Sequence, residues 1–197
     1  GIINHHANKT WKTQNVRFGY FDFVDDIKIS GDLLNAVAQW GKERGMENIQ
    51  GPMGITDFDK EGMLLEDFDR MGSINTIYNY AYYPKHMEAL GYIKEVDWVQ
   101  IHIDIPSETP KKYARVARYS KEMFNLKVKK MTNKDITRRG YGYKIFHLLN
   151  EAYRPIFGFT ELSDKQIDDF VNQYLNLVDK QWITLVENDK DELVGVA

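Results

Sequence analysis

Cysteine is absent from this sequence of 197 residues, which excludes disulfide bonds, thiol catalysis and cysteine-ligated zinc. No run of about 18 apolar residues occurs, so no membrane span is expected. The sequence also lacks a secretory signal pattern, and we expect a cytoplasmic protein. Because an initiator methionine is missing as well, we expect the chain to be a fragment from the middle of a longer protein. Its 43% hydrophobic and 13% aromatic residues nevertheless indicate a packed globular fold.

Charge is unevenly distributed along the chain, although the formal net charge is only −3. Residues 111–144 contain twelve Lys and Arg against two acids, whereas residues 57–70 contain six acids and two bases. The basic segment could attract nucleic acid or cofactor phosphates. A solvated helix face is the favoured interpretation, because no aromatic-glycine RNA-binding signature or zinc-finger spacing accompanies it.

The first half of the sequence predicts strands on both sides of one helix. Residues 16–24 are apolar at odd and even positions, which is typical of a central strand buried on both faces. Ser30 is expected to cap a helix that ends at Arg44-Gly45. A short strand at 48–50 follows, and then an ordered acidic and aromatic loop over 55–79.

The second half begins after the proline-rich linker at 106–110. Ser163 and Gln166 have the spacing of a capping box, which predicts a helix from that point. The other elements that periodicity predicts are a basic amphipathic helix at 111–124, strands at 126–132 and 181–187, a long helix at 135–153, and an apolar arm at 193–197.

The segment YYPKHMEALGYIKEVDWVQIHID, residues 82–104, predicts a helix that ends at Gly91 and a strand over 96–105. A helix that ends in a leucine-glycine-aromatic triplet before a late strand resembles the GNAT superfamily of acyl-CoA N-acyltransferases. The segments INHHAN, GYFDFVDD, ERGMENIQGPMG and YNYAYYPKH are also similar to a bacterial family with two N-acetyltransferase-like units in tandem.

The resemblance implies an α/β (α+β) fold with a mixed, largely antiparallel sheet flanked by helices. Residues 1–105 resemble the later half of an acyltransferase unit, and 126–197 resemble the earlier half of a second one. Residues 106–125 would be the linker and the basic helix. Unpaired strand edges are costly, so we expect the halves to complete one composite sheet in permuted order, either within one chain or between chains. That sheet should open in a V beside residues 16–24.

The resemblance also implies a binding site for acetyl-CoA or another acyl-CoA. The family's glycine-rich pyrophosphate loop falls at residues 25–32, where only Gly31 fits the pattern, and three aspartates oppose a polyanion. A capped structural helix is the alternative interpretation of this segment. The residues expected at the cofactor are Phe23, Val24, Ser30, Gly31, Asp32, Gly51 and Gly54.

The catalytic groups implied by the resemblance are a general acid and a general base. The family's tyrosine, which protonates the thiolate, falls at Met87 by register, and Tyr83 lies one turn earlier. Asp22 and Asp25, on or just beyond the central strand, are candidate bases if they are desolvated. Core packing for Tyr83, and ion pairing or helix capping for the aspartates, remain alternative roles.

The implied function is transfer of an acyl group from acyl-CoA to a small-molecule amine. The alternative is a catalytically degenerate unit that serves binding or dimerisation, so a homodimer is allowed for. Neither a membrane nor nucleic acid is expected as a partner. Asp57, Asp59 and Glu61 begin like a calcium loop, but Phe68 stands where a bidentate glutamate is required, so no metal is expected.

Overall fold

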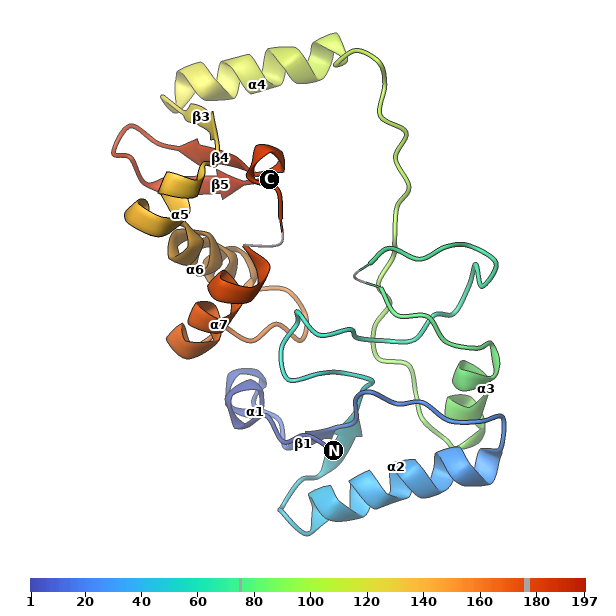
Figure 1. Cartoon of the computed structure of the whole chain (residues 1–197). Coiled ribbons are helices and arrows are strands. Elements are labelled where there is room, and N and C mark those ends of the chain that lie inside the picture. The colour runs from blue at the N-terminus through green and yellow to red at the C-terminus, as the bar shows by residue number, and fades with distance from the viewer. Residues whose placement is uncertain (75, 176–177) are drawn as a thin grey trace. The chain divides into compact units, whose positions relative to one another are not determined.

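The computed structural model describes residues 1–74, 76–175 and 178–197, which form two compact units (Figure 1). The first unit comprises Gly1–Gln100 with Phe157–Thr160, and the second comprises Ile101–Ile156 with Glu161–Ala197. The described chain is a mixed α/β protein with small parallel and antiparallel sheets and no closed barrel. Among the described residues, no strand pairs across the two sheets.

A β–α–β arrangement organises the first unit. Strand β1 (Asn15–Arg17) pairs in parallel with β2 (Asn48–Gln50), and helix α2 (Ile27–Lys42) connects them. Parallel strands require such a crossover. Val16 and Leu34, from β1 and α2, are almost fully buried. The short strand that the sequence predicts at 48–50 is confirmed.

The strand predicted over 16–24 is wrong beyond Arg17. Its partner β2 is followed by Gly51 and Pro52, and proline has no N–H to continue a ladder. Two further backbone hydrogen bonds, Phe18 N to Gln50 O at 3.0 Å and Met53 N to Phe18 O at 2.8 Å, hold the chains together. The expected V-shaped opening is therefore absent between β1 and β2 and at Phe18, where the two chain segments are still joined by hydrogen bonds.

Helix α2 also begins earlier than the sequence suggested. Asp26 is its N-cap and accepts a hydrogen bond from Lys28 N at 2.8 Å. The prediction that Ser30 caps the helix is wrong, because Asp26 satisfies the first turn and Ser30 lies one turn inside, fully buried. A further helix, α1 (His5–Trp11), was not predicted; the side chain of Asn4 caps it.

Helix α3 (Tyr82–Ala89) confirms the predicted helix before Gly91, whose φ of 83° suits a residue without a side chain. The strand predicted over 96–105 is wrong: in this fully described segment no residue is in a strand. Val99 is 81% exposed and Ile101 is 72% exposed. Among the described residues, this alternating segment therefore pairs with no neighbouring strand.

The second unit is built around an antiparallel sheet with the order β3-β4-β5, formed by Lys127–Lys130, Thr184–Glu187 and Leu193–Val196. These strands confirm the predictions at 126–132 and 193–197, and β4 confirms the later part of 181–187. A 3-10 turn, η1 (Lys180–Trp182), occupies the earlier part.

Helices α5 (Asn133–Arg139), α6 (Tyr141–Tyr153) and α7 (Asp164–Tyr174) complete the core of the second unit. The single helix predicted at 135–153 is wrong, because Gly140 adopts a left-handed conformation with φ 65° and divides it. The capping box of Ser163 and Gln166 is confirmed at α7. Ile167 of α7 and Leu185 of β4 are fully buried in the core.

Helix α4 (Lys111–Met123) confirms the predicted basic amphipathic helix. Among the described residues, no helix combines the length and the apolar character that crossing a lipid bilayer demands.

Candidate functional site

The carboxyl ends of β1 and β2 are the natural place to look for a site in the first unit. Ligands of parallel α/β sheets bind outside the carboxyl ends of the strands. Two segments leave this edge, 18–26 after β1 and 51–62 after β2, and both carry carboxylates. Asp22 and Asp25 lie on the first segment, and Asp57 and Glu61 lie on the second.

Tyr83 of α3 contacts the first of these segments. Its hydroxyl donates to the carboxylate of Asp22 and accepts from Phe23 N at 3.2 Å. Burial, followed by the hydrogen bond to Asp22, raises the pKa of Tyr83 to about 12. The structure thus brings together Tyr83 and Asp22, two of the three predicted catalytic residues.

The third predicted catalytic residue, Asp25, is reached by His86, one turn further along α3. His86 Nε2 lies 3.0 Å from Asp25 Oδ1, and its Nδ1 lies 2.9 Å from Ser30 Oγ. This order of serine, histidine and aspartate does not make a nucleophilic triad, because Ser30 is fully buried in α2. Ser30 instead fixes the imidazole ring, which in turn holds the largely exposed carboxylate of Asp25.

Two shallow hollows flank Leu34 of α2. The first, of about 160 Å³, is lined by Asp22 and by apolar side chains that include Phe18, Phe21 and Leu33. The second, of about 170 Å³, is lined by Gly31 and by the triplet Leu90, Gly91 and Tyr92. The triplet on which the family resemblance rests therefore meets a predicted cofactor residue, Gly31, in one hollow.

The acidic segment after β2 holds two half-buried carboxyl groups, Asp57 and Glu61. Asp57 Oδ1 and Glu61 Oε1 are both shielded from solvent and have no hydrogen-bond partner among the described residues. Burial raises the pKa of Asp57 to about 6, although Arg17 opposes the shift. Burial and the neighbouring charge of Asp57 raise the pKa of Glu61 to about 8. Near neutral pH these pKa values correspond to an ionised Asp57 and a protonated Glu61.

Arg17 and Asp59 hold the segment that carries this pair. Arg17, at the end of β1 and only 4% exposed, donates from Nη1 to Gly54 O at 3.1 Å. Asp59 Oδ2 accepts from Ile55 N at 2.8 Å and Thr56 N at 2.9 Å. Asp59 Oδ1 accepts from the Tyr20 hydroxyl at 3.0 Å. Asp59 is therefore a turn residue, in contrast to Asp57 and Glu61, each of which has one carboxylate oxygen without a partner among the described residues.

The residues predicted to bind the cofactor occupy different environments. Phe23 is buried and stacks on Tyr83 with the ring centroids 4.2 Å apart, whereas Val24 is exposed. Gly51 lies against the backbone of Phe18, and a side chain on Gly54 would overlap Asp59. Both glycines thus allow close approach of the protein's own chain.

The N-terminus of α2, where the resemblance places the pyrophosphate, does not fit a polyanion. Ser30 is buried inside the helix, and Gly31 is buried with Leu90 close to its Cα. Asp26 occupies the N-cap, and Lys28 is paired with Asp32 at 2.5 Å. One backbone donor of the first turn, Lys28 N, and the nearby ammonium group of Lys28 are therefore already engaged by carboxylates.

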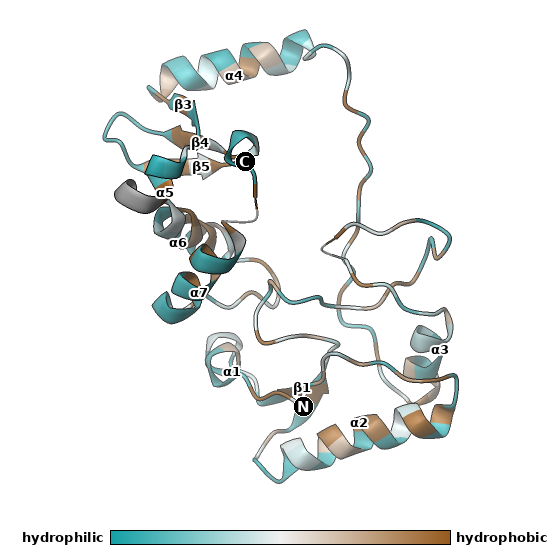
Figure 2. Ribbon diagram, viewed as in Figure 1, coloured by the Kyte–Doolittle hydropathy of each residue, from teal (hydrophilic) through white to brown (hydrophobic). Residues whose placement is uncertain are grey.

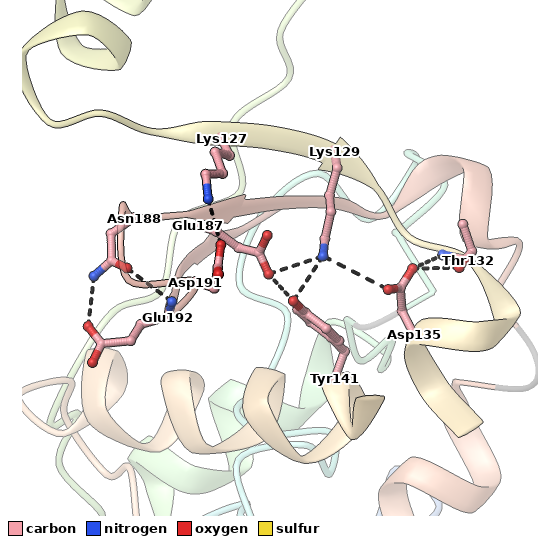
Figure 3. Close-up of polar contacts among 9 residues, drawn as sticks. All are labelled: Lys127, Lys129, Thr132, Asp135, Tyr141, Glu187, Asn188, Asp191 and Glu192. Atoms are coloured by element: carbon pink, nitrogen blue, oxygen red, sulfur yellow. Dashed lines mark hydrogen bonds and ion pairs between the residues drawn. The ribbon is translucent and has the colours of Figure 1, made fainter. Parts of the chain in front are cut away.

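A second buried polar network lies in the second unit (Figure 3). Lys129 Nζ donates to Glu187 Oε1 at 3.0 Å and to the Tyr141 hydroxyl at 2.9 Å, and Tyr141 donates to Glu187. Asp135 lies 3.9 Å from Lys129 and caps α5 together with Thr132. Each buried carboxylate here has partners, which is the pattern of a structural network.

No group of three or more potential ligands for a metal ion occurs within residues 1–74, 76–175 and 178–197. The candidate groups that sequence reasoning missed are His86, Arg17 and the two half-buried carboxyl groups of Asp57 and Glu61. An arginine in a buried strand, followed by a dense acidic segment, was the available signal for Arg17 and the pair. His86 gave no signal, because its spacing matches no ligand pattern.

Comparison with known proteins gives two distant relatives. Protein YghO of Escherichia coli is 26% identical over an alignment of 179 positions, which covers 87% of this chain and 43% of that protein. Bacterial ceramide synthase of Caulobacter vibrioides is 23% identical over 180 residues, which are 91% of this chain and 46% of that protein. No family model and no solved structure matches. The chain spans less than half the length of these relatives, and it is a distant homologue of both.

Proposed function

We propose that the protein takes part in transfer of an acyl group from an acyl-CoA to the amine of a long-chain, lipid-like acceptor. The observation that carries the proposal is the similarity to bacterial ceramide synthase over 91% of this chain. A ceramide is an amide of a fatty acid and a long-chain amino alcohol, so its synthesis forms an N-acyl bond. The GNAT-like triplet Leu90-Gly91-Tyr92 supports the same reaction class.

Amide formation requires a group that takes the proton of the amine as the C–N bond forms and the thiol leaves. The proposal assigns this role to the Asp57–Glu61 pair. A general base works best when its pKa lies near the working pH, and the pKa values of about 6 and about 8 bracket neutrality. One carboxylate can accept the amine proton, and the carboxylic acid beside it can supply one to the departing thiolate.

Asp22, Asp25 and Tyr83 are proposed to act at the same edge. The two aspartates are exposed carboxylates held by side chains of α3, a geometry suited to attracting an ammonium group. Tyr20 connects both groups of carboxylates, because it lines the hollow beside Asp22 and donates to Asp59. Apolar Phe18, Phe21 and Leu33 line that hollow as well, and they can contact a hydrocarbon chain.

The direct test is release of free thiol from acyl-CoA, with a long-chain amino alcohol as the acceptor. Because the chain contains no cysteine, a thiol reagent reports only the released coenzyme. We expect thiol release that requires the amine, and a 10²- to 10⁴-fold lower kcat in Asp57→Asn. Glu66→Gln, an exposed acid on the same segment, is the matched control and should change kcat less than twofold.

A second candidate function is binding without catalysis. The observation that favours it is the N-terminus of α2, where carboxylates occupy the place expected for the pyrophosphate. In that case thiol release should be absent with acyl chains of every length. An amine-dependent rise in the melting temperature that Asp57→Asn leaves unchanged would then support a binding role.

A further inference from the structure

Helix α4 has two chemically different faces. The structure describes the whole helix, and none of its residues is buried. At 100° per residue, the side chains of one face are apolar, and those of the other are basic. The apolar face consists of Tyr113, Val116, Ala117, Tyr119 and Met123, and the basic face of Lys111, Arg115, Arg118 and Lys121, with Lys112 at the edge of the apolar face. Figure 2 shows hydrophilic and hydrophobic residues mixed along α4.

The large side chains of the apolar face are exposed to solvent: Tyr113 is 65% exposed, and Met123 is 59% exposed. Phe124, directly after the helix, extends this face. Such a contiguous apolar stripe is unfavourable in water and marks an interaction surface.

The residues of α4 also contribute little to the stability of the helix. It has 13 residues, a length at which an isolated helix is marginal in water. Its first turn contains Lys111 and Lys112 but no acidic residue, and Pro110 provides no side-chain cap. Positive charges at a helix N-terminus oppose the macrodipole. An external anionic surface would offset this repulsion and cover the apolar face at once.

We propose that α4 binds the surface of an anionic lipid membrane, with its axis in the plane of the interface. Five basic residues against the single acid Glu122 give the helix a net charge of +4, complementary to anionic headgroups. A strongly basic face, low mean hydropathy and aromatic residues on the opposite face are the features of interfacial helices. Tyrosine is also favoured at the headgroup level.

This inference revises the expectation of no membrane partner, which concerned spanning segments. It is independent of the proposed function, because it uses only residues of α4 and Phe124. A nucleic acid could also neutralise the basic face. It would leave Tyr113, Val116 and Met123 in water, however, whereas a lipid surface engages both faces.

The test is co-sedimentation of the 197-residue chain with vesicles of phosphatidylcholine alone or with 30% phosphatidylglycerol. We expect binding to the anionic vesicles, and at least about tenfold weaker binding in Arg115→Glu/Arg118→Glu. Val116→Ser/Met123→Ser should weaken binding by a similar factor, although it leaves the charge unchanged. Lys165→Glu/Lys190→Glu carries the same charge change on exposed residues outside α4 and should bind like the wild type.

A fluorescent probe on Val116→Cys gives a second readout, since the chain has no other cysteine. A blue shift on addition of anionic vesicles is expected there, and no shift is expected for Lys165→Cys. Equal binding of the Arg115→Glu/Arg118→Glu variant and its control would overturn the proposal. So would binding to DNA that depends on Arg115 and Arg118 while Val116→Ser/Met123→Ser leaves vesicle binding intact.

Discussion

The two units differ in whether their buried carboxylate oxygens have hydrogen-bond partners. In the second unit, Glu187 is buried with Lys129 and the Tyr141 hydroxyl as partners, as Figure 3 shows. In the first unit, Asp57 and Glu61 each bury one oxygen that has no hydrogen-bond partner among the described residues. Burial raises the pKa of both groups in the first unit.

This difference separates a structural role from a functional one. A paired buried ion fixes geometry, and removing one partner is strongly destabilising. A carboxyl group with a buried oxygen that lacks a partner destabilises its own ionised form, and such a perturbed proton affinity marks a candidate functional group. The comparison predicts that equivalent substitutions will have opposite effects on the stability of the two units.

Glu187→Ala should give the largest loss of stability. The substitution leaves the ammonium group of Lys129 and the hydroxyl of Tyr141 without their shared acceptor. Because the side chain of Lys129 is 29% exposed and can reach water, we expect a loss of about 2–3 kcal/mol, below the range for fully buried pairs. Hydrogen exchange at the amides of β3, β4 and β5 measures this loss.

Glu187→Gln is the control for shape, since it keeps an acceptor for both donors and removes only the charge. It should lose about half as much as Glu187→Ala. If both variants exchange at the wild-type rate, the network contributes nothing to the second unit, and its difference from the first unit disappears.

Glu61→Gln should increase the stability of the first unit at alkaline pH. The pKa of Glu61 is raised from 4.5 to about 8, so the folded protein binds this proton more tightly than the unfolded chain does. Its contribution to stability is therefore complete below about pH 4.5 and is lost as the pH rises to about 8. Glutamine cannot ionise and avoids this loss.

The expected gain for Glu61→Gln is about 1–2 kcal/mol at pH 9, allowing for the partly exposed side chain, with no gain at pH 4. Melting temperatures at both pH values measure it. Glu66→Gln should follow the wild type at each pH. A Glu61→Gln curve parallel to that of the wild type would mean that Glu61 is already ionised and paired.

The parts of the fold that the sequence predicts well are those with local signals. The capping box of Ser163 and Gln166 and the glycine stop at Gly91 depend on residues within one turn of the helix ends. The strands at 16–24 and 96–105 were predicted from the pattern of apolar residues along the sequence. A strand also needs a partner, and residue periodicity contains no information about one.

Some features of the candidate site are also visible in the sequence, whereas others arise only in the folded protein. The cluster of tyrosines before Gly91 and the aspartates after β1 are visible in the sequence, and the structure places Tyr83 against Asp22. The raised pKa values of Asp57 and Glu61 depend on desolvation, which is a property of the folded protein. In the sequence the same residues resemble an ordinary acidic loop.

Tyr83→Phe tests a paired carboxylate within the first unit itself. The substitution removes the donor to Asp22 and leaves the buried Phe23 N–H without its acceptor. We expect a loss of about 1–2 kcal/mol in urea unfolding at unchanged m-value. Tyr80→Phe, at an exposed position of the same segment, should change the midpoint by less than the experimental error. A loss of equal size in both variants would assign the effect to packing of the tyrosines.

Asp191→Asn should have the smallest effect, although its carboxylate lies only 2.6 Å from Lys127 Nζ. Both side chains are more than half exposed, and exposed pairs contribute little. The hydrogen bond from Lys127 lowers the pKa of Asp191, so any contribution is present at neutral pH and is lost as the pH falls below about 4. Asparagine also tolerates the left-handed φ of 59° at this position. Unfolding midpoints at pH 7 should therefore differ slightly in 10 mM salt and coincide in 1 M salt. A difference that persists in 1 M salt would show that proximity, without burial, is enough to make a carboxylate structural in this unit.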